Sequence, residues 1–172
     1  MIIASYRLPR RISRSTNFAQ SSTIQRIGRS MTPLACAFSL PQASGVIDRP
    51  IRWIVDDCAK FVEREIRRGR RYDAIIMDPP SYGRGPGGEV WKLESNLWDF
   101  VELVSGVLSD DPLFVILNSS PTGLSASTIG YVCQSVFCRR FGGRTESQEL
   151  GLPVTASGLA LPCGAATRVT FS

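Results

Sequence analysis

The sequence predicts an α/β protein with a mostly parallel, doubly wound sheet that ends in an antiparallel hairpin. Short apolar runs at residues 74–77 and 113–117 are typical of buried parallel strands, and stretches with helical spacing at 58–68 and 93–108 alternate with them. The end of the chain, residues 144–171, is expected to be rich in β-structure. With 172 residues and 43% hydrophobic content, the chain can bury one ordinary core, so we expect one folded domain.

The first expected elements are a strand over residues 52–55 and a helix over residues 58–68. The strand ends in two acids, Asp56 and Asp57. Apolar side chains recur along one side of the helix, which predicts a buried face formed by Ala59, Phe61, Val62 and Ile66. Gly69 follows the last of these turns and is expected to end the helix, because glycine readily adopts the left-handed C-cap conformation.

The strand at 74–77 runs directly into an acidic, proline-rich turn that carries the candidate catalytic residues. Asp78 lies where this strand ends, which is the position at which open α/β sheets bind ligands. Pro79 and Pro80 fix φ at about −65° and lack amide donors, so this turn cannot continue as a strand and is expected to hold Asp78 in one pose. Tyr82 then offers a ring face and a hydroxyl near that carboxylate. The alternative is an ordinary strand exit that two prolines terminate.

The segment at 81–90 contains Gly-Arg-Gly-Pro-Gly-Gly but lacks the Gly-Lys-Ser/Thr of a nucleotide P-loop. We therefore expect a mobile lid or substrate loop there. Helical spacing predicts buried positions in the following helix at Leu97, Phe100, Val101, Val104 and Leu108. The remaining expected elements are a strand at 113–117, a helix at 124–137, and a terminal hairpin with Pro153 and Gly158 near its turn and a last strand at 169–171.

The charge of the chain favours a polyanionic partner. The net charge is +5, and the basic residues are eighteen Arg against two Lys. Arginine binds phosphate through a planar fork and stacks on bases, which suits RNA. A codon bias toward arginine explains the same composition equally well, since arginine is also an ordinary surface residue.

Cysteine and histidine usage argues against metal and triad chemistry. The five cysteines, at positions 36, 58, 133, 138 and 163, form no Cys-x-x-Cys pair, and the chain has no histidine. A zinc site and a histidine-based triad therefore lack their usual residues, and reduced thiols of an intracellular protein are the simpler interpretation. The sequence also lacks the long apolar run, of about eighteen residues or more, that a membrane-spanning helix needs.

Residues 1–47 differ from residues 48–172, which form the expected catalytic domain. The first segment has six Arg, no Lys and no acid, and Asp48 is the first acidic residue. Such a composition fits an organellar transit peptide, with a basic cluster at Arg7, Arg10, Arg11 and Arg14. It also fits a disordered RNA-contacting arm. The third interpretation, which we favour slightly, is that this segment results from a shifted reading frame or a misplaced start.

Three sequence segments, in this order along the chain, resemble the motifs of a known family. They are Ile-Arg-Trp-Ile-Val-Asp-Asp at 51–57, Tyr-Asp-Ala-Ile-Ile-Met-Asp-Pro-Pro-Ser-Tyr at 72–82, and Asp-Pro-Leu-Phe-Val-Ile-Leu-Asn at 111–118. Asp-Pro-Pro-x-Tyr after an apolar strand resembles the fourth motif of class I S-adenosylmethionine-dependent methyltransferases. Residues 48–150 resemble the bacterial 23S ribosomal RNA methyltransferase family.

The resemblance implies an incomplete Rossmann-like class I methyltransferase sheet with a C-terminal antiparallel hairpin. In that family, the residues just before this region supply the first strand, a Gly-rich cofactor loop and an acid that hydrogen-bonds to the cofactor ribose. Here Gly28 and Gly45 are the only glycines before Asp48, and no acid precedes it. The implied cofactor is S-adenosylmethionine, and the implied partner is RNA, most simply ribosomal. The implied location is the cytoplasm, or the mitochondrion if residues 1–47 are a transit peptide.

The resemblance also assigns roles to individual residues. Asp57, with Asp56 beside it, matches the acid that accepts a hydrogen bond from the adenine amino group of the cofactor, a role suited to a carboxylate. Asp57 could equally be the N-cap of the helix that follows. Asp78, or the carbonyl next to it, is implied at the target base and at the cofactor, and Tyr82 is implied to stack on the base.

The chemistry expected at this site is mainly positioning, because the sulfonium of the cofactor is already a strong electrophile. Attack through C5 of cytosine would additionally need a cysteine adduct. Family members that do this carry the cysteine in the loop after the fifth strand, and the corresponding residues 118–123 contain none. Three functions stay open: an active RNA methyltransferase, a truncated or degenerate protein with this fold, and a basic RNA-binding module without catalysis.

Overall fold

The structure is a computed structural model that describes residues 4–5, 54, 56–85, 88–120 and 123–171. The chain divides into two compact units, one formed by residues 1–10 and 58–172 and the other by residues 11–57. The predicted leader and the predicted strand at 52–55 lie outside the described residues, except for Ala4–Ser5 in the first and Ile54 in the second, which is not in a strand. The fold described below is that of the first unit.

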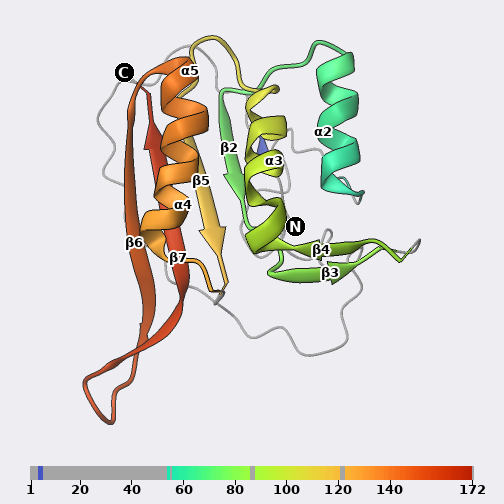
Figure 1. Cartoon of the computed structure of the whole chain (residues 1–172). Coiled ribbons are helices and arrows are strands. Elements are labelled where there is room, and N and C mark those ends of the chain that lie inside the picture. Colours follow the sequence, from blue (N-terminus) through green and yellow to red (C-terminus); the bar gives the residue numbers. More distant parts are fainter. Residues whose placement is uncertain (1–3, 6–53, 55, 86–87, 121–122, 172) are drawn as a thin grey trace, which may run out of the picture. The chain divides into compact units, whose positions relative to one another are not determined.

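Strands of this unit form one main sheet in the order β1-β2-β5-β7-β6 (Figure 1). Their bounds are Ala4–Ser5 for β1, Ala74–Met77 for β2, Phe114–Ser119 for β5, Ala160–Thr170 for β7 and Arg144–Pro153 for β6. Strands β2 and β5 pair in parallel, which confirms the predicted pairing of the two apolar runs. Strand β7 pairs antiparallel with both β5 and β6, so the predicted C-terminal hairpin is also confirmed.

The last strand is much longer than the predicted 169–171. Its first residues, Ala-Leu-Pro-Cys-Gly, have weak β-propensity, and it is the antiparallel pairing with β6 that makes them extended. Gly164 is essential to this arrangement: its φ is 136°, and a Cβ there would lie 1.9 Å from the carbonyl oxygen of Ser119. Only glycine fits where the two backbones approach so closely.

Helices cover one face of the sheet in the described part of the chain, whereas a doubly wound sheet predicts helices on both faces (Figure 1). They are α2 (Cys58–Arg67), α3 (Leu93–Ser105), and a continuous helical stretch of α4 (Ala126–Cys133), η1 (Gln134–Cys138) and α5 (Arg139–Phe141). The face that a helix covers depends on the direction in which its crossover runs across the sheet. The two described crossovers, from β2 to β5 and from β5 to β6, both run toward β6, so α3 and the α4–α5 stretch lie on the same face.

The core lies between this sheet face and the helices. Alternate residues of β5 are buried, and Val115 pairs in register with Ile75, as Leu117 does with Met77. All predicted apolar positions of the helix at 93–108 are buried, namely Leu97, Phe100, Val101, Val104 and Leu108. Helix α3 itself ends at Ser105, and Leu108 instead forms a β-bridge with Tyr72.

The predicted helix at 124–137 begins at Ala126 and continues, through a π-helical turn, to Phe141. Two side chains satisfy amides of its first turn: Ser125 accepts from the amide of Thr128, and Glu149 of β6 accepts from the amide of Ala126 at 2.9 Å. Gly130 allows the helix to approach β6, because a Cβ there would lie 2.3 Å from the Ser147 hydroxyl oxygen. The helix is therefore fixed to the hairpin by a cap and a close contact.

Glu65 is a buried acid that the sequence does not predict, since it lies in a helix rich in charged residues. Its side chain is 1% exposed. It accepts hydrogen bonds from the Tyr72 hydroxyl, from Arg68 Nη1 at 3.1 Å and from Arg70 Nη1 at 3.4 Å. Burial alone would raise the pKa of the Glu65 carboxyl, but these hydrogen bonds and the Arg70 charge outweigh it and lower the pKa below the usual 4.5. The cluster ties α2 to the segment that leads into β2.

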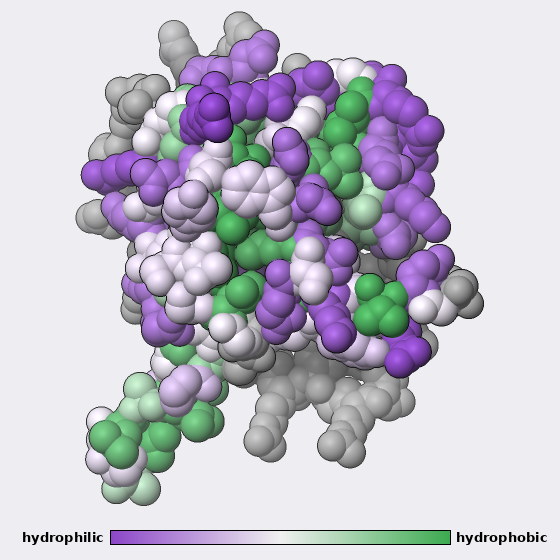
Figure 2. All heavy atoms as spheres, in the orientation of Figure 1, coloured by the Kyte–Doolittle hydropathy of each residue, from purple (hydrophilic) through white to green (hydrophobic). Residues whose placement is uncertain are grey.

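The end of the β6–β7 hairpin forms an uncharged apolar arm, residues 150–164. The chain carries no charged residue from 150 to 167. Strand β5 ends at the pair Ser119 and Ala165, so beyond this point β6 and β7 pair only with each other. The arm extends from the body in Figure 1, and its surface in Figure 2 is largely hydrophobic. Its large exposed side chains are Leu152, Val154, Leu159 and Leu161.

Among the residues that the structure describes, every helix is too short or too polar to span a membrane.

Core and arm leucines should differ sharply in their contribution to stability. Leu117 is 1% exposed in the centre of the sheet, so Leu117→Ala should lower the free energy of unfolding by about 2–5 kcal/mol. Leu161 on the arm is 59% exposed, so Leu161→Ala should change it by less than about 0.5 kcal/mol. Urea denaturation followed by circular dichroism measures both, and equal losses would place the arm in the core.

The Glu65 cluster should make stability depend on acid pH. Because the folded-state pKa of Glu65 is lower than its usual 4.5, the carboxylate stabilises the fold above about pH 4.5. This contribution is lost as the pH falls through the folded-state pKa. Glu65→Gln should therefore be less stable than wild type at pH 7, and the difference in melting temperature should shrink toward pH 3. The matched control is Glu63→Gln, on the exposed side of the same helix; an equal effect there would contradict the assignment.

Candidate active site

The candidate site lies at the edge of the sheet where β2 and β5 end. Because these strands are parallel, the chain leaves both at the same edge, and Asp78 follows directly after Met77. Strand β7 starts its pairing with β5 there, at Ala165 opposite Ser119. The placement predicted for Asp78, at the open end of a central strand, is confirmed.

The Asp78 carboxylate is available for a ligand. The residue is exposed, and within the described part of the chain its carboxylate has no hydrogen-bond or ion-pair partner. Pro79, next in the chain, is buried, so the turn is anchored while the acid faces outward. An ionised carboxylate only accepts hydrogen bonds, which suits an amino or ring N–H of a ligand.

Trp91 holds the proline turn, a role that the sequence does not predict. Its indole nitrogen donates to the carbonyl oxygen of Pro80 at 2.7 Å. The ring packs edge-on against Phe100 of α3, with 5.6 Å between ring centroids. The amide of Leu93 donates to the carbonyl of Ser81 at 3.0 Å. These contacts fix the turn to the first residues of α3, which supports the predicted single pose of Asp78.

The Gly-rich segment is not an open loop: its two ends form a β-hairpin. Strand β3 (Tyr82–Arg84) pairs antiparallel with β4 (Val90–Lys92), with Tyr82 opposite Lys92 and Gly83 opposite Trp91. Just after β3, the amide of Gly85 donates a hydrogen bond to the carbonyl of Glu89, just before β4, at 2.9 Å. Tyrosine, valine and tryptophan favour strands, and most of the glycines fall between them in the turn. Where an irregular lid or substrate loop is expected, the structure therefore has two paired strands, and the role of lid or substrate loop stays a prediction.

Tyr82 lies on β3 with its ring accessible. The residue is 51% exposed. Its hydroxyl accepts a hydrogen bond from Nε of Arg84 at 2.9 Å. The ring is therefore held at one end and open on its surface, and Figure 1 shows the hairpin beside the ends of β2 and β5. The stacking role that the resemblance assigns to it stays a prediction.

Asp56 and Asp57 belong to the second unit, and their cofactor role also stays a prediction. Both are exposed, and the amide of Asp57 donates to Oδ1 of Asp56 at 2.8 Å. Asp57 immediately precedes α2, which begins at Cys58. The two interpretations of Asp57, cofactor ligand and helix N-cap, both remain open.

Two of the described cysteines, Cys133 and Cys138, lie in surroundings that disfavour the thiolate form. Burial, and to a smaller extent the nearby Cys138, raises the pKa of the Cys133 thiol to about 12. Burial also raises the pKa of Cys138. Both thiols are therefore protonated near neutral pH and are poor nucleophiles. In the described ranges, no group of His, Cys, Asp and Glu side chains is arranged to hold a metal ion.

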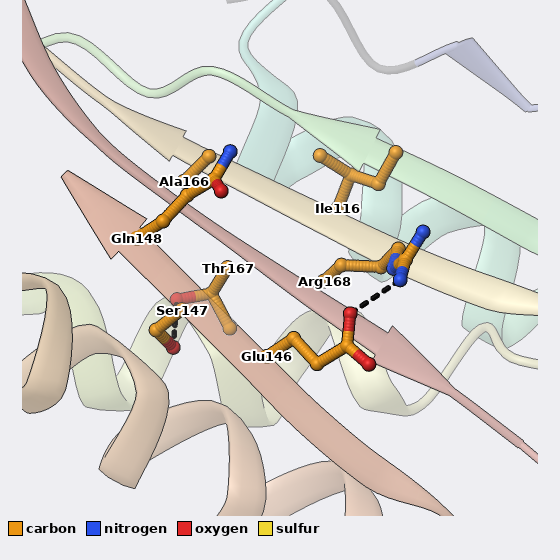
Figure 3. Close-up of a pocket in the computed structure, with 7 residues that line it drawn as sticks. All are labelled: Ile116, Glu146, Ser147, Gln148, Ala166, Thr167 and Arg168. Atoms are coloured by element: carbon orange, nitrogen blue, oxygen red, sulfur yellow. Dashed lines mark hydrogen bonds and ion pairs between the residues drawn. The ribbon is translucent and has the colours of Figure 1, made fainter. Parts of the chain in front are cut away.

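A shallow hollow lies on the face of β6 and β7 that points away from the helices (Figure 3). Its charged groups are already paired with each other: Arg168 forms an ion pair with Glu146, which also contacts Arg144 at 3.4 Å. The hollow is lined by Ile116, Glu146, Ser147, Gln148, Ala166, Thr167 and Arg168. Since none of these residues belongs to the strand-end turn, the hollow is separate from the Asp78 site.

No protein-family model and no curated protein matches the sequence. Solved structures do match. A SAM-dependent methyltransferase from Agrobacterium tumefaciens is 32% identical, with a TM-score of 0.66 over 76% of this chain and 43% of that protein. A protein from Streptococcus mutans, provisionally assigned as a SAM-dependent methyltransferase, is 17% identical, with a TM-score of 0.57 over 80% of this chain and 36% of that protein.

SMU.776, provisionally assigned as a methyltransferase and solved with bound SAH, is 19% identical, with a TM-score of 0.56 over 80% of this chain and 37% of that protein. The chain thus spans less than half the length of the methyltransferases that it matches. Their shared arrangement identifies the described part of the chain as part of a class I methyltransferase fold, with a partial Rossmann-like sheet and an antiparallel C-terminal hairpin.

Proposed function

We propose that this chain provides the substrate-binding edge of an S-adenosylmethionine-dependent methyltransferase that acts on RNA, most simply ribosomal RNA. The observation that carries the proposal is Asp78-Pro79-Pro80-Ser81-Tyr82 at the open end of β2, in a sheet similar to that of a SAM-dependent methyltransferase. Open α/β sheets bind their ligands at this edge. The resemblance to the bacterial 23S ribosomal RNA methyltransferase family adds the substrate class.

In this function Asp78 orients the target base. Its carboxylate, or the carbonyl beside it, accepts a hydrogen bond from an amino or ring N–H of the base, and Tyr82 stacks on the ring. Trp91 keeps the turn between them in place through Pro80. Holding the nucleophilic nitrogen in line and within contact distance supplies much of the acceleration of such a transfer.

S-adenosylmethionine, when bound, supplies the electrophilic methyl group. The exposed Asp78 carboxylate, which has no hydrogen-bond partner among the described residues, fits a cofactor that presents N–H donors, and Asp57 is the proposed acceptor for its adenine amino group. Residues 118–123 contain no cysteine, so we propose a nitrogen of the base as the methyl acceptor, not C5 of cytosine.

A second candidate is a degenerate protein with this fold that binds RNA without catalysis. It is favoured by one feature of the sequence: before Asp48 there are only two glycines, Gly28 and Gly45, and no acid. A Gly-rich loop and a ribose-binding acid are therefore not recognisable. The two candidates differ in cofactor binding and in methyl transfer, and both differences can be measured.

Replacing Asp78 should abolish methyl transfer and leave the fold intact. Because the side chain is exposed and makes no described contact, Asp78→Ala should change the free energy of unfolding by less than about 0.5 kcal/mol. The assay measures transfer of a tritiated methyl group to total ribosomal RNA at millimolar cofactor. The matched control is Asp99→Ala, an exposed acid of α3, which should keep wild-type activity. Equal activity of Asp78→Ala and wild type would remove Asp78 from the mechanism.

The 172-residue chain should bind S-adenosylmethionine weakly. Residues 1–47 contain no recognisable Gly-rich loop or ribose-binding acid, and three hydrogen bonds from such groups, at about 1 kcal/mol each, correspond to roughly a hundredfold in affinity. Isothermal titration calorimetry measures this directly. A micromolar dissociation constant would instead show that residues 1–47 build a cofactor site that their sequence does not reveal.

A further inference from the structure

The outer face of the β3–β4 hairpin places an aromatic ring among cations. Tyr82 pairs in register with Lys92, and Arg84 follows two positions after Tyr82 on the same strand. Alternate residues of a strand point to the same side, so these three side chains share one face of the hairpin. All three are exposed.

The opposite face of the hairpin points into the protein. Gly83 pairs with Trp91 there, and the Trp91 ring packs against Phe100 of the core helix α3. The Tyr82 face must therefore point away from the core. This face is also rigidly placed, because the Trp91 indole is bonded to the carbonyl of Pro80 in the same turn that carries Asp78.

The donors of the two cations are still available. Arg84 uses Nε to donate to the Tyr82 hydroxyl at 2.9 Å, and in the described part of the chain its terminal nitrogens have no partner. The Lys92 ammonium likewise has no ion-pair partner among the described residues. The hydrogen bond to Tyr82 orients the guanidinium, and an oriented guanidinium loses less conformational entropy when it binds a phosphate.

We propose that Tyr82, Arg84 and Lys92, here called the hairpin platform, bind a single-stranded RNA segment at the target nucleotide. Tyr82 stacks on the base, and Arg84 and Lys92 hold the phosphates on either side of it. Charge complementarity supports the assignment: an exposed ring flanked by two cations that form no ion pair with the described residues matches a base flanked by phosphodiesters. The proposal rests on the proposed function for naming RNA as the polyanion.

The RNA must be single-stranded at this point, because a base in a duplex stays stacked between its neighbours and cannot stack on the Tyr82 ring. The platform is adjacent to Asp78 along the chain, with Pro79, Pro80 and Ser81 between that acid and β3. One nucleotide could thus be stacked by Tyr82, oriented by Asp78 and held by its phosphates. Arg84 and Lys92 are accordingly positioning residues.

The larger basic cluster of the chain lies elsewhere. Arg67, Arg68, Arg70 and Arg71 follow one another at the C-terminal end of α2, which precedes the beginning of β2, at the opposite end of the sheet from Asp78 (Figure 1). Arg68 and Arg70 are partly neutralised by Glu65. General basicity therefore does not explain the platform, and this cluster offers a matched control: Arg67, which is exposed and has no partner among the described residues.

The test measures binding of a short, fluorescently labelled single-stranded RNA by anisotropy as a function of salt, without cofactor. On single strands the slope of log affinity against log salt falls by about 0.7 for each phosphate contact removed. Arg84→Gln and Lys92→Gln should each lose about one contact and bind several-fold more weakly at low salt. Arg84→Lys should largely keep the slope, and Arg67→Gln should keep both slope and affinity.

Stacking has its own variants. Tyr82→Phe keeps the ring but loses the hydroxyl that orients Arg84, so it should bind at most a few-fold more weakly than wild type. Tyr82→Leu loses the ring as well and should bind about tenfold more weakly or worse. Thermal melting checks that each variant is folded. Equal losses for Arg84→Gln and Arg67→Gln, or no RNA binding by the wild type, would overturn the platform.

The two proposals fail in different ways. RNA binding with these variant effects but without methyl transfer at millimolar cofactor would support the platform and contradict the proposed function. If the wild type transfers methyl groups, and Arg84→Gln and Lys92→Gln leave the KM for RNA unchanged, the result would support the proposed function and contradict the platform. A rise in KM for RNA at unchanged kcat is the result expected of positioning residues.

Discussion

The parallel pairing of β2 with β5 is the constraint on which the rest of the structure depends. It places Ile75 beside Val115 and Met77 beside Leu117, so four buried side chains form one apolar surface for the helices. Parallel strands cannot be joined by a tight turn, so α3 must cross between them and cover that surface. The same pairing brings the ends of both strands to one edge, where Asp78 emerges. The fold of the core and the place of the site thus have one cause.

What this edge can do depends on how stiffly its turn is held. Pro79 and Pro80 restrict the backbone, but restriction alone does not select a direction for Asp78. The direction comes from Trp91, whose indole binds the Pro80 carbonyl while its ring packs on Phe100. A hairpin that starts in the turn and returns to the first residue of α3 therefore fastens the site to the core. Such fixed geometry is what a reaction limited by alignment needs.

The sequence predicts the elements whose pattern is local. The apolar runs at β2 and β5, the buried face of α3 and the strand-end position of Asp78 all follow from spacing. It does not predict features that distant residues create. The first residues of strand β7 are extended by pairing with β6 despite weak propensity, and α3 and the α4–α5 stretch share a face because both described crossovers run one way. Trp91 was missed as a site residue because nothing in Val-Trp-Lys reveals its partner, Pro80, eleven residues earlier.

Glu65 shows why a perturbed carboxyl need not mark the site. Its pKa is lowered, which is often a sign of function, yet its partners Tyr72, Arg68 and Arg70 are all side chains of this chain and all lie before β2. The cluster is satisfied, so it stabilises the junction of α2 with the sheet and leaves little for a ligand to bind. Asp78 has the opposite character, since the fold fixes its backbone and leaves its carboxylate without a partner among the described residues. Unused hydrogen-bonding capacity on a fixed backbone, more than an altered pKa, is therefore the property that makes Asp78 the candidate for ligand binding, whereas Glu65 is structural.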